Sequence, residues 1–415
     1  MKRIQRIMIL FILLFLSYVN VSAQDTIYSL NKYKEEELNT IISGYKEDNK
    51  KDGFITIGSI KNKDDTQLPI IVKFKKTGEV VWSYTHFSTE DESIVSVNYS
   101  YQNDVVDGYL LLIHKKEKDV LVKVDLLGIN CWERELDGYY EKMVLITDDN
   151  NDNVMYLLIG EKDDKAIIDT YNMDISFMER KEFPKDGYHT SFKDIASINK
   201  NQYALLYNSK KDEEENYELW LIDWNSQEIK IIDNPLDKYE DYHLYSNYNS
   251  FILYGVTSEV KLKKGAESYY LKKYNQEGNM EWESVGNIPV NPEKPIVLRE
   301  YNGNYYLLYE NADSSKEVIL LDQEGIYKEK RKKINNNYYT FNNFYVKGKT
   351  LYIVGQIRCG EDDDCNYKTN SLFLVSGEEK VIEVEDNAST GILICVGLLV
   401  VLTGFLIVIK KRIKV

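Results

Sequence analysis

Three segments of the chain repeat one pattern: a strand-forming run, a polar turn around a glycine, and a second strand-forming run with a tryptophan four residues after the glycine. They read IVKFKKTGEVVWSYTH at 71–86, LVKVDLLGINCWEREL at 121–136 and LKKYNQEGNMEWESVGN at 271–287. A hairpin that recurs at a long period is typical of a repeat architecture. The number of copies therefore constrains the fold more than any single motif does.

Aligning the chain on this hairpin places seven turns about 50 residues apart. They centre on Gly78, Gly128, Asp174, Asn225, Gly278, Gly325 and Gly377. Ahead of each turn lies a short apolar run, such as 54–57 or 110–113, which is typical of a fully buried strand. Ahead of that run lies a weaker alternating segment, as at 94–101, 140–147 and 296–301. Each repeat therefore contains four strands, here named A to D in chain order.

Four strands in each of seven repeats predict an all-β fold, a seven-bladed β-propeller with strand A innermost. A β-sandwich would not explain the regular spacing, and an open solenoid would leave its end repeats without caps. Two other blade counts stay open. The ring has six blades if Gly377 does not mark a true hairpin, and eight if residues 25–34 supply a strand to another blade.

The polar turn followed by an aliphatic and tryptophan pair, as in GEVVW at 78–82 and GNMEW at 278–282, resembles the PQQ-like, quinoprotein-type propeller repeat. The tryptophans are then expected to pack between adjacent blades. That family includes quinone-dependent alcohol dehydrogenases and non-enzymatic scaffold proteins. Its enzymes carry adjacent cysteines, a catalytic aspartate and calcium ligands, and this chain has no adjacent cysteine pair. The resemblance therefore implies the fold rather than the chemistry, and no quinone or other organic cofactor is predicted.

Both ends of the chain carry membrane signals. Residues 1–24 combine a basic start, an apolar run at 7–16 and a V-S-A cleavage site, which predicts a signal peptide. Residues 391–409 are apolar apart from one threonine, long enough to span a bilayer, and the basic tail 410–415 follows at once. We expect a single-pass protein of the cell membrane with a cytoplasmic tail. Its propeller, residues 25–386, lies outside the cell and is joined to the membrane helix by a linker at 387–390.

The formal net charge of −15 excludes nucleic acid as an expected partner, because an acidic body repels phosphate backbones. The partner that we expect is therefore an extracellular protein or polysaccharide. An acidic surface also suits cationic ligands, but its ordinary meaning is solubility.

Two short motifs have competing interpretations. Asp148, Asn150 and Asp152 present oxygens at alternate positions, which resembles a calcium loop, but Asn153 stands where such a loop needs glycine. We favour an ordinary A to B turn and keep calcium as the alternative. Cys359 and Cys365 would close a local disulfide in an oxidising exterior or remain free thiols.

Long variable connections concentrate between strands B and C, at 61–69, 209–216, 257–268 and 357–370. In an up-and-down propeller they emerge on the same side as the D to A connections, and we call this side the loop face. Binding residues usually lie on such loops. We therefore expect a binding or scaffold module. The alternative is an extracellular enzyme with its site in the central funnel, although the four histidines match no catalytic or metal motif and no catalytic residue is assigned.

Overall fold

The computed structural model of the chain describes residues 26–30, 32–46, 49–147, 153–226, 228–233, 242–247, 249–257, 268–286, 290–334, 338–358 and 369–376. All of them belong to one compact unit, residues 25–376. The predicted signal peptide, linker, membrane helix and tail lie outside these ranges. Within the ranges, no helix is long and apolar enough to cross a membrane.

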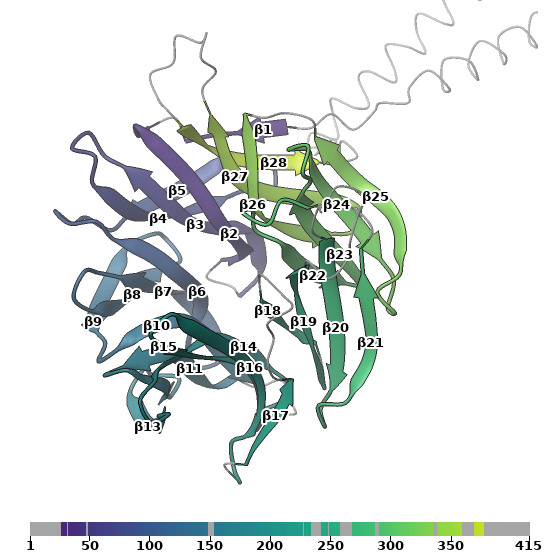
Figure 1. Cartoon of the computed structure of the whole chain (residues 1–415). Coiled ribbons are helices and arrows are strands. Elements are labelled where there is room, and N and C mark those ends of the chain that lie inside the picture. Colours follow the sequence, from purple (N-terminus) through teal and green to yellow (C-terminus); the bar gives the residue numbers. More distant parts are fainter. Residues whose placement is uncertain are drawn as a thin grey trace, which may run out of the picture. The chain divides into compact units, whose positions relative to one another are not determined.

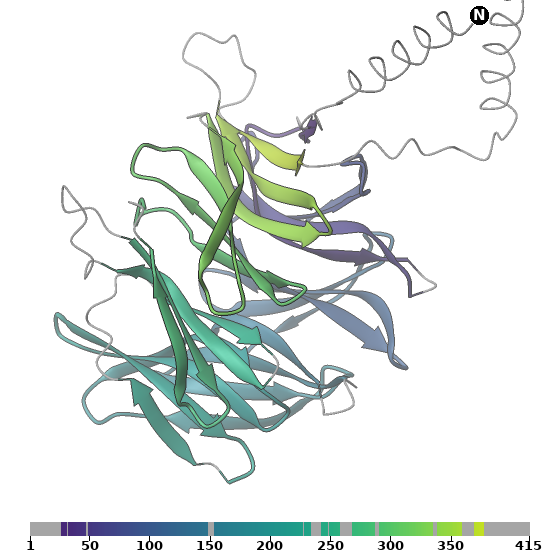
Figure 2. The same ribbon diagram turned by 90° about the vertical axis from the view of Figure 1, so that its right-hand side faces the viewer.

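Seven antiparallel four-stranded sheets stand around a common centre, which confirms the all-β, seven-bladed propeller (Figure 1). In blades 1 to 6 the strands follow chain order from the innermost strand A to the outermost strand D. Figure 2 shows the same ring from the side.

The strands of blades 1 to 3 are β2 (Glu35–Tyr45), β3 (Lys51–Lys61), β4 (Gln67–Phe74), β5 (Val80–Thr85), β6 (Ser93–Gln102), β7 (Val105–His114), β8 (Asp119–Asp125), β9 (Asn130–Glu135), β10 (Tyr139–Thr147), β11 (Asn153–Lys162), β12 (Lys165–Tyr171) and β13 (Phe177–Phe183).

The strands of blades 4 to 6 are β14 (His189–Ser197), β15 (Gln202–Lys211), β16 (Glu214–Asp223), β17 (Ile229–Asp233), β18 (His243–Asn247), β19 (Ser250–Thr257), β20 (Ser268–Asn275), β21 (Met280–Val285), β22 (Val297–Tyr301), β23 (Asn304–Glu310), β24 (Lys316–Leu321) and β25 (Tyr327–Ile334). Blade 7 contains β26 (Tyr339–Lys347), β27 (Thr350–Arg358), β28 (Thr369–Ser376) and β1 (Thr26–Tyr28).

Burial follows the position of each strand in its blade. The middle strands B and C are covered by neighbouring strands and by the adjacent blades, so a strand such as β19 is buried along its whole length. The outer strands show the opposite pattern, and most side chains of β9 are exposed. This contrast explains why continuous apolar runs located the B strands in the sequence.

The C to D turns of blades 1, 2, 3, 5 and 6 share a five-residue geometry with a left-handed residue in fourth place. Gly78, Gly128, Gly278 and Gly325 occupy that place with φ between 74° and 89°. In blade 3 the residue is Ile175, with φ of 61°, and not Asp174 as the sequence alignment placed it. Positive φ is rare for a β-branched side chain. The third copy is therefore a true repeat whose glycine has been replaced.

The tryptophans of the outer strands pack between blades, as predicted. Trp82 of blade 1 lies over the turn of blade 2, where its indole N–H donates to the carbonyl of Leu126 at 3.0 Å. A Cβ added to Gly128 would lie 2.8 Å from the Trp82 ring. Trp282 of blade 5 stands in the same relation to Gly325 of blade 6. The turn glycine therefore has two roles: it adopts the positive φ of the turn, and it leaves room for the tryptophan of the preceding blade.

The ring is closed by the start of the chain. β1 pairs antiparallel with β28, with Thr26 opposite Val375 and Tyr28 opposite Phe373, so it is the outer strand of blade 7 (Figure 1). The sequence alignment had expected that hairpin to continue after Gly377. The region at 25–34 does supply a strand, but to the seventh blade, and neither the six-blade nor the eight-blade count holds.

A buried carboxylate holds this closure together. The Oε1 atom of Glu36 accepts the backbone N–H groups of Lys32 and Tyr33 at 2.6 and 2.9 Å. Its Oε2 atom accepts the Ser371 hydroxyl at 2.9 Å. Glu36 is only 1% exposed. One side chain thus joins the first blade to β28 of the last blade, and its buried charge is satisfied by hydrogen bonds from both.

We predict that Gly128→Ala destabilises the ring more than Gly187→Ala does. Both glycines have positive φ, so both variants carry backbone strain of about 1 kcal/mol. Only at Gly128 does the new methyl group meet the Trp82 ring, whereas nothing lies within 4 Å of it at Gly187. The clash should add about 1–3 kcal/mol, measured as the difference in the free energy of unfolding in urea. Equal losses of unfolding free energy in the two variants would contradict a close contact between Trp82 and the turn at Gly128.

Candidate functional site

All four histidines of the chain reach the loop face. His86 directly follows β5, His114 ends β7, and His189 and His243 begin β14 and β18. Each of these positions is an end of a strand B or D or the start of a strand A. The sequence alone showed only that the histidines belong to different repeats, whereas the fold gathers them on one side.

His86 is held between two glutamates. Its Nδ1 lies 2.6 Å from Oε2 of Glu92, and its Nε2 lies 3.1 Å from Oε2 of Glu133. Lys115 Nζ also contacts Glu133, at 2.6 Å. The hydrogen bond that His86 forms to the Glu92 carboxylate raises the pKa of His86 despite its burial. Burial would raise the pKa of Glu133, but the hydrogen bonds from Lys115 and His86 outweigh it and lower that pKa.

His114 forms a pair with a fully buried aspartate. Its Nδ1 lies 2.7 Å from Oδ1 of Asp119, and Oδ2 of Asp119 accepts the backbone N–H of Tyr140 at 2.6 Å. Burial lowers the pKa of His114, yet the interaction with Asp119 more than compensates and the pKa is raised. Among the described residues, nothing forms a hydrogen bond to the other ring nitrogen. A buried carboxylate therefore orients an imidazole whose Nε2 remains available to a ligand.

The loop face is hollowed beside His114. The hollow has a volume of about 270 Å³ and is lined by His114, Lys115, Tyr139, Tyr140, Glu141, Glu161 and Lys193. Its charged groups are paired, one pair within the wall and one with a residue beside it. Lys193 Nζ lies 2.7 Å from Glu141, and His189 Nε2 lies 2.9 Å from Glu161. With two lysines facing two glutamates, the hollow offers many hydrogen-bonding groups and little net charge.

Two residues of this wall reach the hollow because the innermost strands bulge. The β10–β11 ladder skips Glu141, and the β14–β15 ladder skips Lys193. The ladders of β2, β6 and β26 skip Asn39, Val95 and Asn342 at the matching place. A bulge redirects a side chain out of the regular alternation, and bulges are frequent beside functional sites. The sequence analysis did not detect them, although an extra residue shifts the alternation along strand A by one position and so leaves a signal in the sequence.

The innermost strands carry polar side chains that pair from blade to blade. Asn342 Nδ2 donates to Asn39 Oδ1 at 2.9 Å across the closure of the ring. Lys142 Nζ lies 2.5 Å from Asp194, and Arg299 donates to Asn343 Oδ1 at 2.6 Å. Within the described part of the chain, no group of three or more histidine, cysteine, aspartate or glutamate side chains is arranged to hold a metal ion. These polar groups thus join neighbouring blades.

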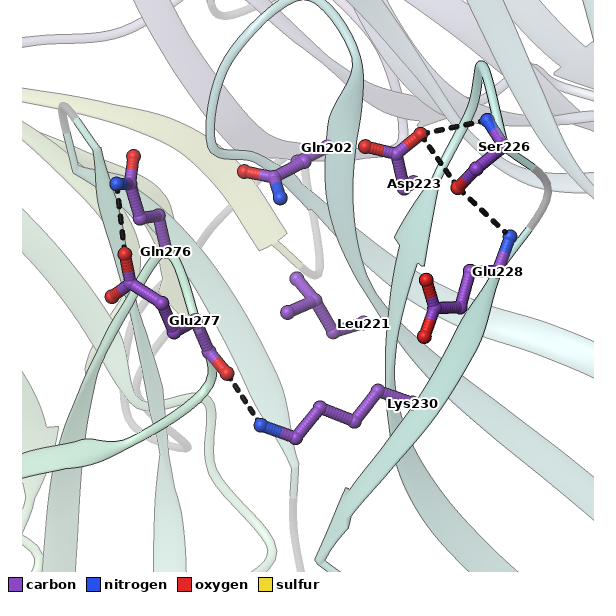
Figure 3. Close-up of a pocket in the computed structure, with 8 residues that line it drawn as sticks. All are labelled: Gln202, Leu221, Asp223, Ser226, Glu228, Lys230, Gln276 and Glu277. Atoms are coloured by element: carbon purple, nitrogen blue, oxygen red, sulfur yellow. Dashed lines mark hydrogen bonds between the residues drawn. The ribbon is translucent and has the colours of Figure 1, made fainter.

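A larger hollow of about 320 Å³ lies on the opposite side, where the C to D turns of blades 4 and 5 meet (Figure 3). Its wall is formed by Gln202, Leu221, Asp223, Ser226, Glu228, Lys230, Gln276 and Glu277. Asp223 accepts the hydroxyl and the N–H of Ser226, which shapes the turn, and Lys230 Nζ donates to the Glu277 carbonyl at 2.6 Å. These side chains hold the two turns together, so we assign this hollow to the seam between the blades.

A third hollow of about 310 Å³ lies on the seam of blades 2 and 3. Arg180 forms a two-pronged ion pair with buried Asp169, with Nε to Oδ1 and Nη2 to Oδ2 both at 2.7 Å. The hydrogen bond to Asp169 raises the pKa of Arg180. The donors of Arg180 are further occupied by Asp137 and Tyr140. This network stabilises the contact between blades 2 and 3, and we do not assign it as a ligand site.

The structure does not test the two short motifs that the sequence singled out. Asp148, Asn150 and Asp152 of the suggested calcium loop lie outside the described residues, as do Cys359 and Cys365. Cys131 is an exposed free thiol on β9. Of the long connections, 209–216 is largely paired, because β15 and β16 extend to Lys211 and Glu214, and its acidic run stands at the tip of a hairpin.

No protein-family model and no curated protein match the chain. Solved structures that resemble it include the β-propeller domain of the trilobed protease of Pyrococcus furiosus, with 12% identity over 83% of this chain and 95% of that one, at a TM-score of 0.49. The WD40 domain of Toxoplasma gondii coronin has 9% identity over 87% of this chain and 89% of that one, at a TM-score of 0.45. The AfRom2 CNH domain has 8% identity over 86% of this chain and 99% of that one, at a TM-score of 0.48. The fold assignment rests on the seven sheets themselves.

We predict that the free energy of unfolding falls as the pH rises above 6.5. His86, His114 and His189 all have raised pKa values, so their contribution is complete below the ordinary value of 6.5 and is lost as the pH passes through the raised values. His86→Gln should remove part of this slope and cost about 1–3 kcal/mol at pH 6, because buried Glu92 then keeps only Lys115, at 3.6 Å, as a cationic partner.

His189→Gln is the matched control. The side chain of His189 is 39% exposed against 7% for His86, so its replacement should change both the stability and the slope less. Urea unfolding at a series of pH values measures both quantities. An unfolding free energy that rises above pH 6.5, or a larger effect at His189, would refute this account.

Proposed function

We propose that this chain is a membrane-anchored propeller of the cell surface that binds a partner through the hollow beside His114. The observation that carries the proposal is the pair of bulges that turn Glu141 and Lys193 into one hollow on the loop face. The apolar segment 391–409 and the signal-like segment 1–24 support placement outside the cell on a single membrane helix.

The hollow is suited to a small neutral or zwitterionic group. Ligand pockets usually begin at about 300 Å³, so this hollow accepts one unit of a larger molecule. Tyr139, 42% exposed, adds an aromatic surface beside the ion pairs. A sugar unit of a polysaccharide or a polar side chain of a protein has the hydrogen-bonding capacity and lack of net charge that this wall would recognise.

An extracellular enzyme is the second candidate, favoured by the Asp119–His114 pair, which orients an imidazole as general-base sites do. The wall supplies lysine, tyrosine and glutamate to this pair but no serine, threonine or cysteine. Binding is therefore the function that the wall supports better. The likeness of the repeats to the PQQ-like family concerns the fold and adds neither a quinone nor a metal to the proposal.

We predict that Glu141→Ala with Lys193→Ala weakens ligand binding while the ring stays folded. The two side chains neutralise each other and are partly exposed, so removing both leaves no unpaired charge. Full-length protein in detergent would be screened on arrays of glycans and of peptides, and the affinity for each hit measured by titration. We expect binding by wild type and a loss of about tenfold or more in the double variant.

The matched control is Lys75→Ala with Glu79→Ala, which removes an exposed ion pair of 2.7 Å from the C to D turn of blade 1. This variant should bind as wild type does. Equal losses in both double variants would contradict a site on the loop face, and arrays without any hit would contradict the binding function.

We predict that a chain ending at Thr390 is released into the medium, because it lacks the only long apolar segment after the signal-like start. Cell fractionation followed by immunoblotting compares it with the full chain. Recovery of the shortened chain in the membrane fraction would contradict anchoring by residues 391–409.

A further inference from the structure

A row of three polar side chains crosses blade 4 near its loop-face end. Ser191 of β14 lies opposite Asn208 of β15, and Asn208 lies opposite Tyr217 of β16. Residues that are opposite one another in antiparallel ladders share a face of the sheet. Leu206, two residues from Asn208 and therefore on the same face, belongs to the core that blades 4 and 5 share. The row thus faces blade 5.

Ser191 is buried without a hydrogen-bond partner. Its side chain is 1% exposed, and no described residue forms a hydrogen bond to its hydroxyl. A buried hydroxyl that makes no hydrogen bond destabilises the folded state. Packing between the two blades gives no reason for it, because an alanine would occupy the same place without this loss. A hydrogen bond to a bound molecule would account for the hydroxyl.

The other end of the row holds a carboxylate in a fixed orientation. Oε1 of Glu215 accepts the Asn208 side-chain N–H and the Tyr217 hydroxyl, both at 2.9 Å. Among the described residues, no hydrogen bond or ion pair is made by Oε2 of this carboxylate. Glu215 is exposed near the tip of the β15–β16 hairpin. Its Oε2 atom is therefore available to hydroxyl groups outside the protein.

Tyr217 stacks on an aromatic ring of the next blade. Its ring and that of Tyr242, which directly precedes β18, have centroids 4.8 Å apart and planes 30° apart. Both rings are half-buried, and both pack against the core shared by blades 4 and 5. Part of their apolar surface remains open to solvent. We call these two residues the tyrosine pair.

The row lies beside the hollow at His114. Burial raises the pKa of the Tyr217 hydroxyl, and the nearby carboxylates of Glu215 and Glu141 raise it further. Glu141 belongs to the wall of the hollow. On β14, Ser191 is two residues from Lys193 of the same wall, which separates their Cα atoms by about 7 Å. One extended ligand can therefore contact both places.

We propose that Ser191, Glu215 and the tyrosine pair form a second subsite, and that the partner of the loop face is a neutral carbohydrate chain whose adjoining units occupy the hollow and this subsite. The proposal rests on the proposed function, since it extends the same binding face. A sugar ring has apolar C–H faces and a rim of hydroxyls. One face can stack on the tyrosine pair while hydroxyls of the rim donate to Oε2 of Glu215 and bond to Ser191.

The test uses neutral oligosaccharides of glucose, mannose, galactose or N-acetylglucosamine, each one to four units long. They are titrated into the full-length protein in mild detergent. Wild type should bind at least one series, with an affinity about tenfold or more higher for two units than for one. Ser191→Ala should lower the affinity for the longer chains about fivefold. Its melting temperature should equal or exceed that of wild type, because the variant removes a buried hydroxyl that lacks a partner.

Tyr217→Phe keeps the stacked ring but removes a donor that orients Glu215, so it should also weaken binding of the longer chains. The matched control is Ser29→Ala, which removes another buried hydroxyl without a partner among the described residues, in the segment between β1 and β2. It should bind as wild type does. A Ser191→Ala variant that loses stability together with affinity would show a structural role and overturn the assignment.

The two proposals fail in different ways. A wild type that binds neither glycans nor peptides contradicts both of them. Binding of peptides alone overturns the carbohydrate subsite and leaves the binding function. Glycan binding that depends on Glu141 and Lys193 but is unchanged in Ser191→Ala, or that does not increase with chain length, likewise overturns the subsite alone.

Discussion

The contact on which the ring depends is the one between an outer strand and the C to D turn of the following blade. Trp82 lies against Gly128, Trp282 against Gly325 and Ile232 against Gly278. At the closure, Tyr28 takes the same place against Gly78. A different residue type fills the position in different blades, but in these four seams the turn residue opposite it is a glycine. In blade 3 the same turn position is Ile175. Since a blade cannot bury its faces alone, each seam stabilises two blades at once.

Closure extends this dependence to the whole ring. β1 has only three residues, yet it completes the seventh sheet and supplies Tyr28 to the first seam. Glu36 also accepts a hydrogen bond from Ser371, which lies 335 positions further along the chain. Contacts of such separation form late and at a high entropic cost, so they need strong local chemistry. A buried carboxylate with donors from both ends of the chain meets that need.

The sequence predicted the features that each repeat specifies by itself. Turn glycines, apolar B strands and outer tryptophans gave the period and the seven blades, because each arises from backbone conformation or burial within one hairpin. The closing strand was misplaced because Thr26–Tyr28 is short and resembles no repeat, while Gly377 resembles a turn. The bulges at Glu141 and Lys193 recur at the matching place in β2, β6 and β26, so they belong to the repeat, but the search for turns and apolar runs did not include a break in the alternation of strand A.

The Asp119–His114 pair shows where sequence analysis could have gone further. His114 ends strand B and Asp119 begins strand C, so the antiparallel register sets them opposite each other. Applying that register to each repeat would have found the pair, whereas a search for sequential motifs could not.

The two faces of the ring also differ in the kind of contact that joins adjacent blades. Turn residues such as Gly128 are fixed by close packing at their seams. On the loop face, adjacent blades meet through polar side-chain contacts, such as His86 with Glu133, so a change of binding chemistry there also alters contacts between blades.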